Sequence, residues 1–381
     1  MMTTGHFARA ATFSVNSTAD QHDASPGDGV CASASRDCTL RAAIEEANAL
    51  TGSDVIVLAP GVYHVRKGTL AIGDDVSIDG GGAATIHGGR HEGLLSVAPA
   101  ATVTLRGLAL GHSALFGLGI GACILNEGTL MLDHVDVERC RAWQGAGLFN
   151  SGVAMVVDST IYGNHCREGG GAGIYNAANA QLTVERSTLT YNRARKGVGG
   201  GALHNAGTAV LTNVTMWHNR ARRSFGGACV NDGILTLTNV TAVANHAAHE
   251  SGGLVNHGTA TLVNTILAES RTSHAHNTNC AGTLPVSLGH NLDSGVACGF
   301  DSACDLNGIH AFVQDPAENG GPTETMALSP ESPAIDAGDD SSCPATDERG
   351  IARPQGSHCD IGAVEMVSKT KATPTRIRPS P

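Results

Sequence analysis

The sequence predicts an all-β fold, a right-handed parallel β-helix of three sheets capped by a short N-terminal α-helix. Six copies of one pattern fill residues 121–270, and each carries an asparagine at an equivalent place: Asn126, Asn150, Asn176, Asn205, Asn231 and Asn256. The copies are 24 to 29 residues apart and hold strand-length apolar stretches but no helix-length one. No copy can bury its apolar face alone, so the copies must stack, and we expect ten or eleven coils.

One copy shows the expected strands. Gly201–Asn205 is a short strand, residues 209–212 alternate apolar and polar side chains, and residues 214–218 supply a third strand. Neighbouring coils should lie about 4.7–4.9 Å apart, which places equivalent residues above one another. A second asparagine repeats in step at Asn164, Asn192, Asn219 and Asn245, with Cys140 and Ser270 in the flanking copies. Asparagine can hydrogen-bond above and below and tolerates a sharp corner, so we interpret both sets as structural ladders.

The chain divides into five segments. We expect a disordered N-terminus at 1–11, an N-terminal cap at 12–54, coils at 55–330, a closing segment at 331–366 and a disordered tail at 367–381. Leu40, Ile44 and Ala47 have helical spacing, which predicts an amphipathic helix over the first coil. Such covers protect the open sheet edge at each end of a solenoid from further strand pairing.

Composition excludes several classes of protein. The 381 residues carry a formal charge of −11, which disfavours nucleic acid as a partner of the whole molecule. No apolar run approaches the ~18–20 residues of a membrane span. Residues 1–11 lack the apolar stretch of a signal peptide. We expect a monomer.

Cysteine spacing predicts disulfides and an oxidising compartment. The three close pairs outside the repeats are Cys31 with Cys38, Cys280 with Cys298, and Cys343 with Cys359. None has the Cys-x-x-Cys spacing of a metal site. The remaining cysteines are Cys123, Cys140, Cys166, Cys229 and Cys304. Cys140 and Cys166 lie on adjacent coils and could pair, whereas Cys123 and Cys229 suit small buried slots.

Both ends of the chain resemble segments of known bacterial proteins. The string from Cys38 to Asn48, CTLRAAIEEAN, resembles the CSLREA segment of bacterial surface β-helix proteins. The strings SPAIDAG at 332–338, DERG at 347–350 and CDIGAVE at 359–365 are similar to the end of the choice-of-anchor Q domain. The repeats are similar to those of polymorphic outer membrane proteins. The resemblance, over residues 12–366, implies a right-handed β-helix that is secreted or held at the cell surface, associated with the outer membrane; it implies no reaction.

Basic residues recur immediately after the second asparagine of each coil. They are Arg141, His165, Arg193, Arg220, His246 and Arg271, and the following loops add Arg167, Arg195, Lys196, Arg222, Arg223 and His249. Stacking should align the first six as a row about 24 Å long. The row predicts binding of an acidic polysaccharide or a host or cell-surface glycan, because arginine suits carboxylate and sulfate groups. The sequence shows no interleaved aromatic residues for base stacking, and this disfavours DNA. Solvated loop charge, paired with Glu168 and Glu250, is the first interpretation of these residues, and polyanion binding is the hypothesis set against it.

Carboxylates suggest a second column, Asp133, Asp158 and Glu185, which continues as Asn213, Asn239 and Asn264. Neighbouring carboxylates would repel, and calcium or Arg186 could offset this. A solvent-facing ladder is the first interpretation, a weak calcium site the second and a glycosidase pair the third. We expect no other cofactor.

Two functions from different classes follow. The first is a non-catalytic, exported, adhesin-like β-helix protein that binds acidic polysaccharide along its arginine-rich edge. The second is a polysaccharide lyase or glycoside hydrolase, which would need an acid and a base on adjacent coils beside that edge.

Overall fold

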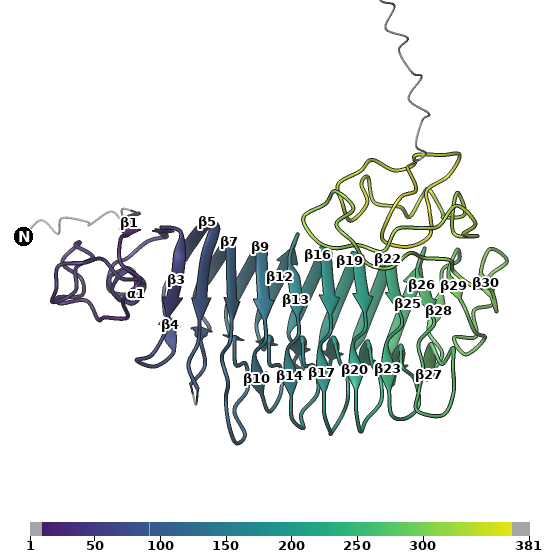
Figure 1. Cartoon of the computed structure of the whole chain (residues 1–381), viewed down its shortest axis with the longest axis horizontal. Coiled ribbons are helices and arrows are strands. Elements are labelled where there is room, and N and C mark those ends of the chain that lie inside the picture. Colours follow the sequence, from purple (N-terminus) through teal and green to yellow (C-terminus); the bar gives the residue numbers. More distant parts are fainter. Residues whose placement is uncertain (1–9, 91, 368–381) are drawn as a thin grey trace, which may run out of the picture.

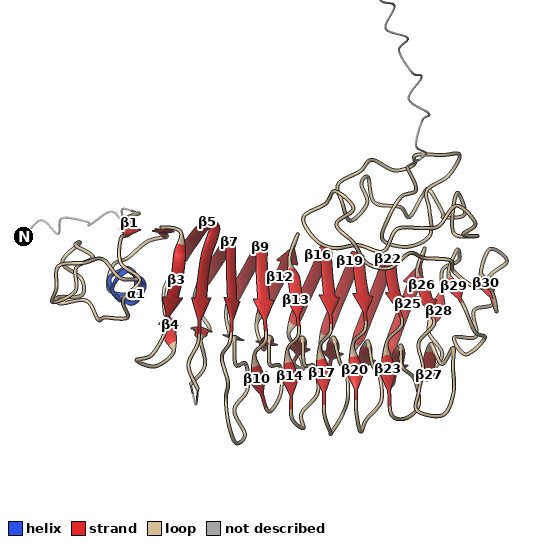
Figure 2. Cartoon of the chain, viewed as in Figure 1, coloured by secondary structure: helices blue, strands red, loops and turns tan. Residues whose placement is uncertain are grey.

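The computed structural model describes residues 10–90 and 92–367, and in this part of the chain the strands form a right-handed parallel β-helix. The predicted disordered ends, 1–11 and 367–381, fall almost entirely outside the described residues. Strands of three sheets follow one another around the axis, and the coils stack along it (Figure 1). The one helix of the described part, α1 (Leu40–Ala49), lies at the N-terminal end, as expected (Figure 2). Thr39 caps it by accepting a hydrogen bond from the Ala42 amide.

The largest sheet of the described chain has sixteen strands. They are β1 (Thr12–Val15), β2 (Asp54–Leu58), β3 (Gly61–His64), β5 (Val76–His87), β7 (Thr102–Gly111), β9 (Thr129–Glu138), β12 (Val153–Val157), β13 (Thr160–Tyr162), β16 (Gln181–Thr190), β19 (Thr208–Trp217), β22 (Ile234–Val243), β25 (Thr259–Val263), β26 (Ile266–Ala268), β28 (Val286–Ser287), β29 (Leu292–Asp293) and β30 (Leu306–Asn307). The two stretches expected within one copy join as a single bent strand, β19, with Asn213 at the bend.

The other two sheets, within the described residues, have nine and five strands. The nine are β4 (Leu70–Ile72), β6 (Leu95–Val97), β8 (Ile124–Asn126), β11 (Leu148–Asn150), β15 (Ile174–Asn176), β18 (Leu203–Asn205), β21 (Cys229–Asn231), β24 (Leu254–Asn256) and β27 (Cys280–Gly282). The five are β10 (Arg141–Ala142), β14 (His165–Cys166), β17 (Arg193–Ala194), β20 (Arg220–Ala221) and β23 (His246–Ala247). Nine strands in the second sheet indicate about nine full coils, fewer than the ten or eleven expected, because the chain after β28 forms only short, irregular strands.

Asparagine ladders run through the interior at both predicted places. Asn126 donates to Asn150 across 2.7 Å, and each later member donates to the next as far as Asn256. In the second ladder, Asn164 donates to Asn192 across 3.1 Å, and the pattern continues to Asn245. All these side chains are essentially inaccessible to solvent. The ladders therefore satisfy buried polar groups at two corners of every coil, between layers of buried Leu, Val and Ile.

The C-terminal segment packs against the side of the solenoid. Figure 1 shows it over the region of β16, β19 and β22, rather than as the end cap that we expected. The Asn213 amide donates to the Thr346 carbonyl across 2.8 Å, and the Ala363 amide donates to Thr241 across 2.9 Å. Outward-facing polar side chains of these coils thus hold the segment in place through hydrogen bonds.

Four disulfides are present in the described chain. Three are the pairs that the sequence predicts: Cys31–Cys38, Cys280–Cys298 and Cys343–Cys359. The fourth joins Cys123 to Cys140, which corrects both the suggested pairing of Cys140 with Cys166 and the expectation that Cys123 only fills a small buried slot. Cys140 and Cys123 belong to the same coil, and Cys166 and Cys229 are free and buried while Cys304 is free and exposed.

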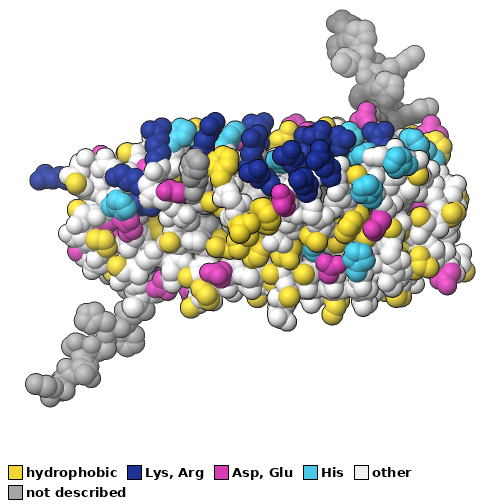
Figure 3. Space-filling model, turned by 90° about the horizontal axis from the view of Figure 1, so that it is seen from below, with side chains coloured by type: hydrophobic (Ala, Val, Ile, Leu, Met, Phe, Trp, Pro, Cys, Tyr) yellow, Lys and Arg dark blue, Asp and Glu magenta, His cyan; other side chains and the backbone are white. Residues whose placement is uncertain are grey.

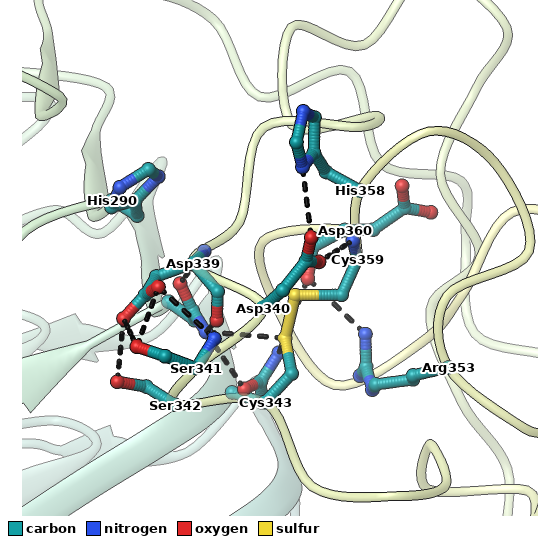
Figure 4. The surroundings of a disulfide bond; sticks show 12 residues. His290, Asp339, Asp340, Ser341, Ser342, Cys343, Arg353, His358, Cys359 and Asp360 are labelled. Atoms are coloured by element: carbon teal, nitrogen blue, oxygen red, sulfur yellow. Dashed lines mark hydrogen bonds and ion pairs between the residues drawn. A yellow bond between two sulfur atoms is a disulfide. The ribbon is translucent and has the colours of Figure 1, made fainter.

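Figure 4 shows the disulfide that stabilises the C-terminal segment, Cys343–Cys359. Asn264 of the solenoid donates to the Cys343 sulfur across 3.2 Å. On the other side, Asp340 accepts from the Cys359 amide across 2.8 Å, and this bond lowers the pKa of Asp340. The disulfide thus lies at the contact between the segment and the coils.

Candidate functional site

Six basic side chains form one row along the five-stranded sheet, where the sequence predicts it. Main-chain pairing sets these residues in register from coil to coil. The row consists of Arg141, His165, Arg193, Arg220, His246 and Arg271. We call it the basic row. Figure 3 shows Lys, Arg and His side chains gathered in one band along the molecule.

A corner separates the basic row from the sixteen-stranded sheet. Its members have positive φ, for example 54° at Arg139, 55° at Tyr191 and 51° at His218. The full corner row is His112, Arg139, Gly163, Tyr191, His218, Ala244 and Glu269. Most of these side chains are large. Two coils differ, because Gly163 and Ala244 leave room above the backbone.

A cavity of about 630 Å³ lies over Gly163. Three successive coils contribute residues to its wall. The preceding coil supplies Arg139 and Arg141, the coil of Gly163 supplies Tyr162 and His165, and the next coil supplies Tyr191 and Arg193. We call this cavity the Gly163 hollow. It is large enough for a sugar ring with its substituents.

Two smaller cavities continue the depression toward Ala244. Their volumes are about 240 and 400 Å³, and both include Ala244 and Arg271 in their walls. The first of them shares Tyr191 and Arg193 with the Gly163 hollow. The three cavities thus form one groove that follows the basic row along the solenoid axis.

Positive charge dominates the groove, where Glu269 of the third cavity lies 3.0 Å from His310. Within the described residues, Arg141, Arg193, Arg220 and Arg271 take part in no ion pair, and neither Glu168 nor Glu250 neutralises them. Burial, together with the charges of Arg141 and Arg193, lowers the pKa of His165 to about 4. Burial and neighbouring arginines also lower the pKa of Arg220. The field in this groove therefore favours an anion, although the whole protein is acidic.

An acidic patch lies on the opposite side of the corner. A cavity of about 540 Å³ there is lined by Asp136 and Glu138 of β9 and by Glu324, which precedes the closing segment of residues 331–366. Glu138 Oε2 lies 3.6 Å from the Arg139 guanidinium. Asp136 is accessible to solvent, but the walls of the cavity reduce its hydration, and this raises its pKa. A hydrogen bond from Thr160 acts in the opposite direction and lowers the pKa by less.

Two tyrosines, Tyr162 and Tyr191, line the groove, and Trp217 packs beside Tyr191 in the wall of the acidic cavity; the sequence analysis missed all three. The ring centroids of Tyr162 and Tyr191 are 5.7 Å apart, and those of Tyr191 and Trp217 are 4.7 Å apart. Both pairs are edge to face, and Tyr191 is 46% exposed. These residues precede the second asparagine by one or two positions, whereas the search considered only the residues that follow it. The stated argument against base stacking is therefore wrong.

Five predicted binding residues lie beyond the groove. Arg167, Arg195, Lys196, Arg222 and Arg223 are exposed on the loops after β14, β17 and β20. None of them belongs to the walls of the cavities described above. They strengthen the positive field, and Arg195 and Arg222 contribute to the low pKa of His165.

The three carboxylates proposed for calcium do not stack as one column. Asp133 and Glu185 both pair with Val157, whereas Asp158 lies one position later at the corner. The error arises because the spacings between true partners are 24 and 28 residues, so an average repeat misplaces the middle member. Arg186 donates to both oxygens of Asp158, across 2.9 and 2.8 Å. This ion pair balances the charge without a cation, although ligand atoms of Asp133, His134 and Asp158 lie within 4.8 Å of one another.

The fold and the groove define the class: a right-handed parallel β-helix protein with a cationic, partly aromatic groove along one corner. Among solved structures, the crystal structure of pectate lyase Pel9A is similar, at 16% identity and a TM-score of 0.44, covering 95% of this chain and 97% of that chain. No family model and no curated protein matches the chain, so the resemblance of its ends to CSLREA and choice-of-anchor Q segments stays a prediction. No helix in the described residues is long and apolar enough to cross a membrane.

Proposed function

We propose that this protein binds a linear, acidic polysaccharide along the groove. The observation that carries the proposal is the basic row, whose arginines are in register and have no ion-pair partner among the described residues. The coils repeat about every 4.8 Å, and four of the six coils in the row carry an arginine while the other two carry a histidine. A polymer laid along the axis could therefore present anionic groups to guanidinium groups one or two coils apart.

The aromatic residues favour a sugar over a nucleic acid. Single-stranded nucleic acids need a series of exposed ring faces on which successive bases stack. Tyr162, Tyr191 and Trp217 instead pack edge to face on one another, and Trp217 is only 8% exposed. Tyr191 is thus the main exposed ring, which suits a local apolar contact with one sugar. A nucleic acid that bound more tightly than any acidic glycan would overturn this choice.

We also propose that the protein works outside the cytoplasm, as a secreted or surface-attached binder. Four disulfides support this, since such bonds persist in oxidising compartments. Burial raises the pKa of the free Cys166 thiol to about 12, which keeps it unreactive there. An adhesin-like role needs binding alone, without cleavage.

The experiment compares two triple variants with equal loss of charge. Arg141→Ser, Arg193→Ser and Arg220→Ser remove the basic row, whereas Arg195→Ser, Arg222→Ser and Arg223→Ser remove outer-loop charges. Binding of polygalacturonate, alginate, heparin, single-stranded DNA and a neutral glucan is measured at two salt concentrations. We expect the first variant to lose acidic-glycan binding by 100-fold or more and the second by less than 10-fold. Equal losses would show that only overall charge matters.

A further inference from the structure

The Gly163 hollow places a basic ring nitrogen and a phenol on either side of one corner. Tyr162 immediately precedes Gly163, and His165 follows it by two positions, and both line the hollow. The intervening Asn164 is buried. Its side-chain oxygen accepts a hydrogen bond from the Cys140 backbone amide across 3.0 Å, and its side-chain nitrogen donates to Asn192. These bonds fix the corner. The floor is Gly163 itself, with φ at +63°, where an added Cβ would meet only the Arg139 side chain, at 3.7 Å.

The arginines flank the histidine symmetrically. Pairing of β14 with β10 and β17 puts Arg141 one coil before His165 and Arg193 one coil after it. Main-chain hydrogen bonds of 2.8 Å, from the His165 amide to Cys140 and from the Arg193 amide to Asn164, hold this register. In the described chain no hydrogen-bond partner occupies the His165 ring, so a nitrogen is free for a ligand. The Arg139 guanidinium lies over the Tyr162 ring, 5.8 Å from its centroid, so a positive charge faces this phenol.

We infer that this hollow cleaves a 1,4-linked uronate polymer by β-elimination, with His165 as the base and Tyr162 as the acid. The inference rests on the proposed binding function and adds a reaction to it. Arg141 and Arg193 would bind the uronate carboxylate and stabilise the negative charge that develops on it when the proton at C5 leaves.

The step balances without a co-reactant. His165 takes the C5 proton, and the electron pair of that C–H bond becomes the C4–C5 double bond. The C4–O bond breaks, its electron pair stays on the glycosidic oxygen, and that oxygen receives the Tyr162 proton. One chain then begins with an unsaturated uronate, and the other ends in a reducing sugar whose C1 carries the freed hydroxyl group. Proton transfer from His165 to Tyr162 through water restores both groups.

The electrostatics fit the assigned base. His165 faces Arg141, Arg193, Arg195 and Arg222, and their charges with its partial burial keep the ring neutral at pH 7. A neutral imidazole can accept a proton, whereas an imidazolium cannot. The bound uronate neutralises part of that positive charge, so the basicity of His165 rises when substrate is present.

The test measures ultraviolet absorbance of unsaturated uronate and chain length, with polygalacturonate, alginate and hyaluronan, in the presence of a calcium chelator. We compare the whole protein with His165→Gln, Tyr162→Phe and, as a control on another face, His257→Gln. We expect the wild type and the control to make unsaturated products from at least one polymer. The first two variants should lose 100-fold or more in kcat while binding changes less than 3-fold.

Each other outcome has a definite meaning. Binding without any product overturns the inference and leaves the proposed binding function standing, whereas absence of binding overturns both. Shortened chains without unsaturated ends mean hydrolysis, which would point to Asp136 and Glu138 instead. Full activity of His165→Gln, or a strict need for added calcium, would overturn the assigned roles of the histidine and the arginines.

Discussion

The Glu348 carboxyl group contacts the Thr188 hydroxyl across 3.0 Å in the interface between the C-terminal segment and the solenoid. Thr188 has one hydroxyl proton, and its 2.6 Å bond to the Glu324 carbonyl uses it. The contact with Glu348 is therefore satisfied when Glu348 is protonated and donates. Full burial raises the pKa of Glu348 to about 8, and the nearby charge of Asp347 acts in the same direction. Hydrogen bonds from Thr215 and Thr323 lower the pKa but do not outweigh burial.

This buried acid predicts that stability falls as pH rises. The folded state keeps the Glu348 proton up to about pH 8, whereas the unfolded chain releases it near pH 4.5. Between these values the unfolded state binds fewer protons, so the free energy of unfolding decreases, by at most roughly 5 kcal/mol at about 1.4 kcal/mol per pH unit. Glu348→Gln should flatten this slope, measured by denaturant unfolding from pH 5 to 9. The exposed Glu331→Gln should keep it. If the free energy of unfolding of Glu348→Gln still fell with pH at the same slope, other titratable groups would be responsible for the effect.

The Cys343–Cys359 disulfide should hold the C-terminal segment on the solenoid. Its loss in Cys343→Ser, Cys359→Ser should destabilise the segment by about 3 kcal/mol, because a loop of 16 residues is no longer closed. Limited proteolysis should then cut residues 339–360 first and leave the coils intact. The matched double variant of Cys31 and Cys38 should leave these residues protected. If both variants are cut at the same rate in the segment, the disulfide has no such role.

The sequence predicts the features that repeat and misses those that depend on a single coil. The ladders of Asn150 and Asn192 and the basic row recur in step, so spacing alone aligns them. Asp158 was misaligned because coil lengths vary beside it. The Gly163 hollow depends on one small residue among large neighbours, which only a register from coil to coil reveals. Contacts such as Thr188 with Glu348 join residues 160 positions apart, and no local pattern predicts them.

The first asparagine ladder should matter for stability at every rung. Asn205 donates to Asn231 across 2.8 Å and to the Ile234 carbonyl across 2.9 Å, and it accepts from Asn176. Asn205→Ala should lower the free energy of unfolding by about 2–4 kcal/mol, since buried partners lose their hydrogen bonds. Thr208→Ala on the exposed edge of the next strand should change it by less than about 0.5 kcal/mol. Denaturant unfolding measures both, and equal values would contradict a structural role for the ladder.

Filling the Gly163 hollow should block the groove without unfolding the protein. Gly163 has φ at +63°, and asparagine tolerates this conformation better than other side chains, at a cost of about 1 kcal/mol. An added Cβ would meet only the Arg139 side chain, at an ordinary 3.7 Å, so Gly163→Asn should fold. Its amide would occupy the space between Tyr162 and His165, and we expect acidic-glycan affinity to fall at least 10-fold. Gly81→Asn is the matched control, with φ at +57° and open space around it, far from the groove. Calorimetric titration of both variants checks this, and unchanged affinity of Gly163→Asn would show that the polymer binds elsewhere along the basic row.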